Sequence, residues 1–214
     1  MATHQFTDRS EAGEQLGAAL RERDVDVDLV LAIPRGGLPL GRAVADALGV
    51  PLDVVVAKKI GAPHNPEYAL GAVASDGSVW RNESALRQVD PGEEYFERER
   101  EKEAENARRK AERYRQGGSE PDVRGKAVVV VDDGVATGST ARACLELLRQ
   151  NGADRLVLAI PVGPPDTVAE LGQLADAVVC LWTPQHFSGV GQFYDRFDQV
   201  SDEAAIAYLD QGGV

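Results

Sequence analysis

Several features that would indicate a particular class of protein are rare or absent in this 214-residue sequence. No apolar run reaches the roughly 18 residues of a membrane span, and the N-terminal residues MATHQFTDRSEAGEQL contain no apolar core of a signal peptide. The two cysteines, Cys144 and Cys180, lie in apolar patterns without CxxC spacing. This favours buried thiols in a reducing compartment over a disulfide or a metal site. We therefore expect a cytoplasmic protein.

Lysine is also scarce, and the balance of charge is strongly acidic. The only lysines are Lys58, Lys59, Lys102, Lys110 and Lys126, and the chain carries 35 acidic against 23 basic residues, a net charge of -12. So acidic a surface disfavours nonspecific binding to nucleic acid or to anionic membranes, and we expect neither as a partner. The length fits a single domain over residues 1–214.

The most informative stretch is KAVVVVDDGVATGSTARACLELLRQ, residues 126–150. Ala127 to Val131 form an unbroken apolar run rich in β-branched side chains, which predicts a buried parallel strand. A turn containing glycines follows, and then a helical pattern for which Ser139 or Thr140 is a suitable N-cap. A strand, a turn and a helix start bring several N–H groups and the positive end of a helix dipole to one point. This arrangement suits a phosphate.

The side chains of the turn predict the rest of the ligand. The hydroxyls of Thr137, Ser139 and Thr140 add donors for a phosphate, whereas Asp132 and Asp133 would repel one but can accept hydrogen bonds from a vicinal diol. The predicted ligand therefore has a phosphate at one end and a ribose diol in the middle. The spacing does not fit a Walker loop, and GxGxxG is absent. A plain strand–turn–helix with solvated acids is the alternative.

A second strand–turn–helix pattern occurs earlier in the chain. Leu29 to Ile33 predict a buried strand, Pro34-Arg35-Gly36-Gly37 a turn, and Leu40 to Leu48 a helix. Because the carboxyl ends of parallel strands share one edge of a sheet, this turn would form a second anion site beside the first. Gly36 and Gly37 permit close backbone approach, and Arg35 offers a planar cation.

A third predicted strand, Leu52 to Ala57, carries Lys58 and Lys59 to the same edge. The rarity of lysine in this chain suggests that the pair serves as a counter-charge, and two solvated surface lysines are the alternative.

The remaining predicted elements are a helix from Thr7 or Ser10 to Arg23, a 70–80 hairpin with a type I′ turn at Asp76-Gly77, a charged helix from the N-cap Asp90 to Arg115, strands 155–160 and 177–182, and a helix 166–174 capped by Asp166. This alternation predicts an α/β fold with a mostly parallel sheet and helices on both faces.

The tail, TPQHFSGVGQFYDRFDQV at residues 183–200, concentrates aromatic residues in a chain that is only 6% aromatic. One interpretation is a packed flap. The other is a small hood, residues 183–214, on which the ring of an acceptor molecule stacks against Phe187, Phe193 and Tyr194.

The run VVVVDDGVATGST closely resembles the phosphoribosyl-pyrophosphate (PRPP) signature of type I phosphoribosyltransferases, and PRGG resembles their pyrophosphate loop. The resemblance implies the fold of that family, a non-proline cis peptide between Pro34 and Arg35, and a mobile lid within residues 61–125, a hairpin and charged-helix insertion. The PRPP-binding residues it implies are Asp132, Asp133, Gly134, Ala136, Thr137, Gly138, Ser139, Thr140, Arg35, Gly36, Gly37, Lys58 and Lys59.

The implied activity is Mg²⁺-dependent transfer of the 5-phosphoribosyl group of PRPP to a purine- or pyrimidine-type base, with release of pyrophosphate, as in nucleotide salvage. Asp132, Asp133, Arg35 and Lys58 are the expected catalytic residues, and the two acids would contact Mg²⁺ indirectly, through ribose or water. The whole chain is more similar to a stand-alone phosphoribosyltransferase-like group than to the enzymes with known bases, so the acceptor stays open. A PRPP-binding regulatory protein without turnover is the alternative. We expect a homodimer.

Overall fold

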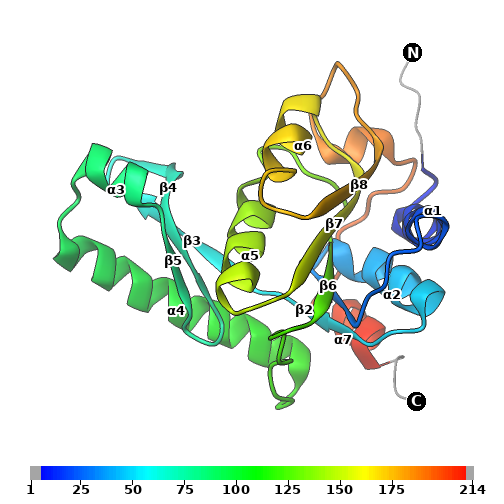
Figure 1. Cartoon of the computed structure of the whole chain (residues 1–214), viewed down its shortest axis with the longest axis horizontal. Coiled ribbons are helices and arrows are strands. Elements are labelled where there is room, and N and C mark those ends of the chain that lie inside the picture. Colours follow the sequence, from blue (N-terminus) through cyan, green and yellow to red (C-terminus); the bar gives the residue numbers. More distant parts are fainter. Residues whose placement is uncertain (1–5, 211–214) are drawn as a thin grey trace.

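The computed structural model describes residues 6–210, apart from the side chain of Glu67, and contains two sheets (Figure 1). The larger sheet has five parallel strands in the order β2-β1-β6-β7-β8. Its strands are β1 (Leu29–Ala32), β2 (Leu52–Val54), β6 (Ala127–Val131), β7 (Arg155–Val162) and β8 (Ala177–Trp182). The chain leaves β1 toward β2 on one side and β6 toward β7 on the other, so a topological switch point lies between β1 and β6.

Helices cover both faces of this sheet, which confirms the predicted fold class (Figure 1). On one face lie α1 (Arg9–Glu22) and α2 (Gly37–Leu48), and on the other lie α5 (Ser139–Gln150) and α6 (Pro165–Leu171). Alternate residues of β6 point to opposite faces: Val129 and Val131 pack with α1 and α2, and Val128 and Val130 pack with α5. Burial on both faces explains why the run that forms β6 has no polar residue.

The smaller sheet belongs to an arm, residues 57–115, that extends away from the parallel sheet (Figure 1). It contains the antiparallel strands β3 (Ala57–Ala62), β4 (Asn65–Ala74) and β5 (Val79–Arg81), followed by α3 (Glu83–Val89) and α4 (Glu93–Arg115). The predicted strand 52–57 is therefore wrong in extent, because β2 ends at Val54. Lys58 and Lys59 lie in β3, in the arm, and not at the end of a strand of the parallel sheet.

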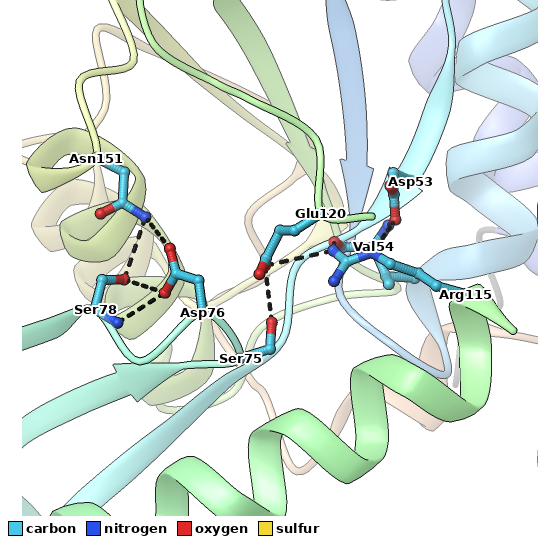
Figure 2. Close-up of polar contacts among 8 residues, drawn as sticks. All are labelled: Asp53, Val54, Ser75, Asp76, Ser78, Arg115, Glu120 and Asn151. Carbon is cyan, nitrogen blue, oxygen red and sulfur yellow. Dashed lines mark hydrogen bonds and ion pairs between the residues drawn. The ribbon is translucent and has the colours of Figure 1, made fainter. Parts of the chain in front are cut away.

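A buried arginine at the end of α4 joins the arm to the parallel sheet (Figure 2). Arg115 Nε donates to Asp53 Oδ1 at 2.9 Å and its Nη2 donates to the Val54 carbonyl at 2.8 Å. Glu120 Oε1 lies 3.5 Å from Arg115 Nη2 and accepts from Ser75 Oγ at 2.8 Å. These five residues, called here the Arg115 cluster, hold both α4 and the β4–β5 turn against β2.

The β4–β5 turn differs from its prediction. Gly77 has φ +85°, but Asp76 does not have the positive φ that a type I′ turn requires. Gly77 N donates to the Ala74 carbonyl at 3.1 Å, and Asp76 Oδ1 accepts from Ser78 N at 2.8 Å, as in a three-residue loop with a glycine bulge. Asn151, at the end of α5, donates to Asp76 Oδ2 at 3.0 Å (Figure 2).

Helix starts were predicted less well than strands, because several residues near each start could serve as the cap. The observed N-caps are Asp8 for α1, Gly36 for α2, Gly92 for α4, Gly138 for α5 and Pro164 for α6. Asp90 does not cap α4, since it adopts φ +46° and ends α3, a helix that was not predicted. The tail forms the 3-10 helix η1 (Val190–Phe193) and α7 (Asp202–Asp210). Among the described helices, none is long and apolar enough to cross a membrane.

Candidate functional site

A cavity of about 560 Å³ lies at the carboxyl ends of β1 and β6. The loops after these two strands form its base, β3 and α4 contribute from the arm, and α1 and the tail close the remaining side. We call it the switch-point cavity. It is lined by Arg9, Ile33, Pro34, Arg35, Gly36, Ala57, Lys58, Lys59, Lys110, Asp132, Asp133, Thr140, Phe197, Gln199 and Val200.

Positive charge dominates this cavity, although the protein is acidic overall. The cationic lining residues are Arg9, Arg35, Lys58, Lys59 and Lys110, and the acidic ones are Asp132 and Asp133. A net charge of -12 on the chain makes such a local excess of cations unexpected for a solvated surface. A concave site lined in this way attracts a polyanionic ligand.

The loop after β1 lies directly against the loop after β6. The peptide bond between Pro34 and Arg35 is cis, as the resemblance implied. A Cβ on Gly36 would overlap the Asp133 carboxylate, and a Cβ on Gly37 would lie 2.6 Å from the Val131 carbonyl oxygen. Gly37 therefore requires glycine, and a side chain at position 36 would displace the Asp133 carboxylate. Arg35 lines the same cavity as the two acids, and its Nη1 lies 3.5 Å from Asp202 Oδ1.

The two acids have different surroundings. Asp133 Oδ2 accepts from Arg9 Nε at 2.8 Å, whereas Asp132 Oδ1 accepts from the Asp133 backbone N–H at 2.9 Å. Burial raises the pKa of Asp132 well above its usual range, and the charge of Asp133 raises it further. Burial also raises the pKa of Asp133, and Arg9 opposes that effect. A ligand that donates hydroxyl groups would stabilise both ionised carboxylates.

The predicted phosphate-binding loop, Gly134 to Thr140, joins β6 to α5. Gly138 has φ +70° and, as the N-cap residue, offers α5 no side-chain cap; Ser139 N makes only a long contact, 3.5 Å, to Thr137 Oγ1. Thr137 Oγ1 and Ser139 Oγ lie 3.0 Å apart, and Thr140 lines the cavity. Thr137 and the neighbouring Ala136 are exposed. The arrangement matches the helix N-terminus at which anions bind in other proteins.

The structure does not bring all predicted site residues to the cavity. Phe193 and Tyr194 are 4% and 2% exposed and pack in the core beneath α1, where Tyr194 Oη donates to the Asp133 carbonyl at 2.6 Å. Phe187 packs on Phe193 with ring centroids 5.4 Å apart. The prediction that Phe193 and Tyr194 stack on an acceptor is wrong, because neither ring has a free face. They form a packed flap, and the ring that lines the cavity is Phe197.

Two residues of the cavity, Arg9 and Lys110, were not predicted from the sequence. Arg9 begins α1, and besides Asp133 it contacts the Asp198 carbonyl at 2.7 Å and the Phe197 ring at 3.8 Å from its centroid. Lys110 reaches the cavity from α4. The scarcity of lysine was the one signal that could have drawn attention to Lys110. Nothing in the sequence separated Arg9 from an ordinary helix-surface arginine.

The chemistry of the site defines a class of protein. A parallel α/β sheet whose switch point combines carboxylates, a glycine loop at a helix N-terminus and a cluster of cations is suited to a phosphorylated ligand that also carries hydroxyl groups. Within residues 6–210, no three His, Cys, Asp or Glu side chains converge as metal ligands.

Comparison with known proteins identifies the family. The family model for the phosphoribosyl transferase domain matches residues 11–195, and the chain belongs to that family. It is 42% identical over 206 residues to a Mycobacterium tuberculosis (strain CDC 1551 / Oshkosh) protein named "Putative phosphoribosyl transferase MT0597", a match that covers 96% of this chain and 46% of the relative. The chain thus spans about half the length of that curated relative.

A solved structure agrees closely with the fold. The crystal structure of TT1426 from Thermus thermophilus is 41% identical in sequence, with a TM-score of 0.90, and the match covers 98% of this chain and 100% of that one. Four cavity residues, Arg9, Phe197, Gln199 and Val200, lie outside the segment that the family model matches. The flanking segments therefore complete the cavity from outside the family domain.

Proposed function

We propose that this protein is a Mg²⁺-dependent phosphoribosyltransferase that transfers the 5-phosphoribosyl group of PRPP to a nitrogenous base of purine or pyrimidine type and releases pyrophosphate. The observation that carries the proposal is the switch-point cavity, in which five cations and two carboxylates face one space in a chain of net charge -12. PRPP combines a 5′-phosphate, a ribose diol and a pyrophosphate. Thr140, the two aspartates and the cations line the cavity and suit these three groups, and Thr137 and Ser139 lie just before Thr140 in the chain.

Each chemical group of PRPP can be matched to one of the loops at the cavity. The first-turn amides of α5 and the hydroxyls of Thr137, Ser139 and Thr140 would hold the 5′-phosphate. Asp132 and Asp133 would accept from the ribose hydroxyls. The Arg35–Gly37 loop and Lys58, with Lys59 in the same cavity lining, would hold the pyrophosphate.

The reaction breaks the bond between C1 of the ribose and a pyrophosphate oxygen, forms a bond from C1 to a nitrogen of the base, and releases the proton of that nitrogen, which the departing pyrophosphate or water can accept. The transition state has oxocarbenium character, so the protein contributes fixed geometry and neutralisation of the leaving group more than a covalent nucleophile. Arg35 and Lys58 would stabilise the charge that develops on pyrophosphate, and Asp132 and Asp133 would fix the ribose ring.

The residues fit an indirect contact to a metal. Asp132 and Asp133 are carboxylates with raised pKa values, and a cation bound nearby would favour their ionised forms. Mg²⁺ prefers oxygen ligands and keeps several waters, so it would be held mainly by phosphate oxygens, with the two acids in contact through ribose or water. When bound, Mg²⁺ neutralises charge on the departing pyrophosphate.

Pyrophosphate release tests the proposal. The protein with PRPP, Mg²⁺ and a panel of purine and pyrimidine bases should release pyrophosphate with at least one base, and the double variant Asp132→Asn, Asp133→Asn should not. Tight PRPP binding without release across the panel would instead support a PRPP-binding regulatory protein. If PRPP does not bind at all, both functions are ruled out.

A further inference from the structure

Lys110 is a cation of the cavity that neither the family motifs nor the sequence patterns assign. It lies on α4, in the arm, and its Nζ donates to the carbonyl oxygen of Pro34 at 3.0 Å. Pro34 belongs to the loop after β1, 76 residues away along the chain. The long helix of the insertion thus delivers a charged group to the loop proposed to hold pyrophosphate.

The packing of α4 fixes the position of this lysine. Ala107 and Ala111, on either side of Lys110 along the helix, are buried in one apolar cluster with residues of β1, β2 and α7. A little further along, the Arg115 cluster ties the end of α4 to β2 (Figure 2). Because both contacts hold the helix, Lys110 projects from a rigid support and is not a freely moving surface lysine.

The charges around Lys110 favour an anionic ligand. Burial lowers the pKa of Lys110, and Lys58 from β3 and Arg35 from the β1 loop lower it further, while Asp132 and Cys144 oppose them. Lys110, Lys58 and Arg35 therefore repel one another, with Asp202 3.5 Å from Arg35 as a partial counter-charge, and an anion between the three cations would remove that repulsion. The ammonium group has three donors, and the Pro34 carbonyl accepts one of them.

We propose that Lys110 binds the pyrophosphate group of the ligand together with Arg35 and Lys58, and that it holds the β1 loop in place through the Pro34 carbonyl at the same time. The identity of the anion rests on the proposed function. In this arrangement the arm supplies a residue that binds the ligand, and that residue lies on the packed helix α4.

Binding of inorganic pyrophosphate, measured by isothermal titration calorimetry, tests the role directly. Lys110→Met should weaken binding by about 10- to 100-fold, the range expected when a hydrogen bond to a charged group is lost. Lys110→Arg, which keeps the charge, should stay within a few-fold of the wild type. The matched control is Lys102→Met, because Lys102 lies on the same helix, is 61% exposed and contacts only Glu99 and Glu103 among the ion pairs of the described residues.

Either of two binding results would overturn the inference: equal affinities for Lys110→Met and Lys102→Met, or no pyrophosphate binding by the wild type. Circular dichroism establishes that each variant is folded. If Lys110→Met does not fold, Lys110→Gln, whose amide can donate to the Pro34 carbonyl, replaces it with the same expected loss.

The experiment separates this inference from the proposed function. Pyrophosphate binding requires neither an acceptor base nor turnover. A protein that binds pyrophosphate through Lys110 but releases none from PRPP would keep the inference and lose the transferase proposal. If Lys110→Met turns over PRPP at the normal rate, the transferase proposal stands and the inference about Lys110 is lost.

Discussion

Neutralising the two site acids one at a time should affect stability in different ways. Asp133 is paired with Arg9 at 2.8 Å, and the two side chains are only 15% and 12% exposed. Asp132 has no ion pair within the described residues, and burial and the charge of Asp133 raise its pKa. Burial raises the pKa of Asp133 as well, but the hydrogen bond and charge of Arg9 oppose that effect. Asp133→Asn therefore deprives the mostly buried Arg9 guanidinium of its carboxylate, whereas Asp132→Asn removes a carboxylate that folding disfavours and leaves no ion pair broken.

The size of the difference follows from that burial. A solvent-exposed ion pair contributes roughly 0.2–1 kcal/mol, but a hydrogen bond to a charged group in a mostly buried pair contributes about 1.5–3 kcal/mol. We expect Asp133→Asn to lower the free energy of unfolding by about 1–3 kcal/mol relative to Asp132→Asn, which should be as stable as the wild type or more so. Urea unfolding followed by circular dichroism measures both values.

The dependence on pH provides an internal check. An aspartate has a pKa of about 3.9 in the unfolded chain, and the pKa of Asp132 is raised in the folded protein, so folding disfavours its ionised form. This cost is absent below the unfolded pKa and develops as the pH rises through the folded pKa. The stability of Asp132→Asn relative to the wild type should therefore increase as the pH rises above the unfolded pKa of about 3.9. The reasoning would be refuted if the two variants were equally destabilised, or if the stability advantage of Asp132→Asn over the wild type decreased as the pH rises.

Two further predictions concern packing. Gly36→Ala should weaken PRPP binding by about tenfold or more, because the added methyl group must displace the Asp133 carboxylate. The control Gly189→Ala, whose methyl group enters open space, should bind PRPP normally in the same titration. Unchanged affinity of Gly36→Ala would contradict the close approach of the two loops. Arg115→Ala should lower the free energy of unfolding, measured with urea, by about 2–3 kcal/mol, because it removes the hydrogen bonds that hold α4 to β2. The control Arg109→Ala, at an arginine that is 66% exposed, should change this free energy by less than about 0.5 kcal/mol. Similar losses in the two variants would contradict the role of Arg115 in holding α4.

The parts of the fold that the sequence predicted well are those with local causes. Residues 127–131 and 177–182 form the strands β6 and β8 with the predicted ends, because short apolar runs between polar residues specify buried strands. The hairpin was found from Asp76-Gly77, but its turn type was not, because Ser78 and Asn151 supply hydrogen bonds to Asp76 that the dipeptide does not reveal. The short helix α3 has no long apolar period and was missed.

Some residues of the candidate site could be predicted from the local sequence, and others depend on tertiary packing. Asp132, Asp133 and Arg35 come from loops whose own sequence carries the signal, and the parallel sheet brings those loops together. The aromatic residues of the tail gave two interpretations, and only packing chose between them: Phe193 and Tyr194 fill the core, while Phe197 is left at the cavity.

By itself, therefore, the sequence determined the fold class, the strand–turn–helix that resembles a PRPP loop, and the family, because each depends on patterns within a few neighbouring residues. The tertiary structure alone decided that Arg9 pairs with Asp133 across 124 positions of the chain and that Lys110 reaches the Pro34 carbonyl. Contacts of this kind depend on how helices pack on a sheet, and a local pattern of residues does not contain that information.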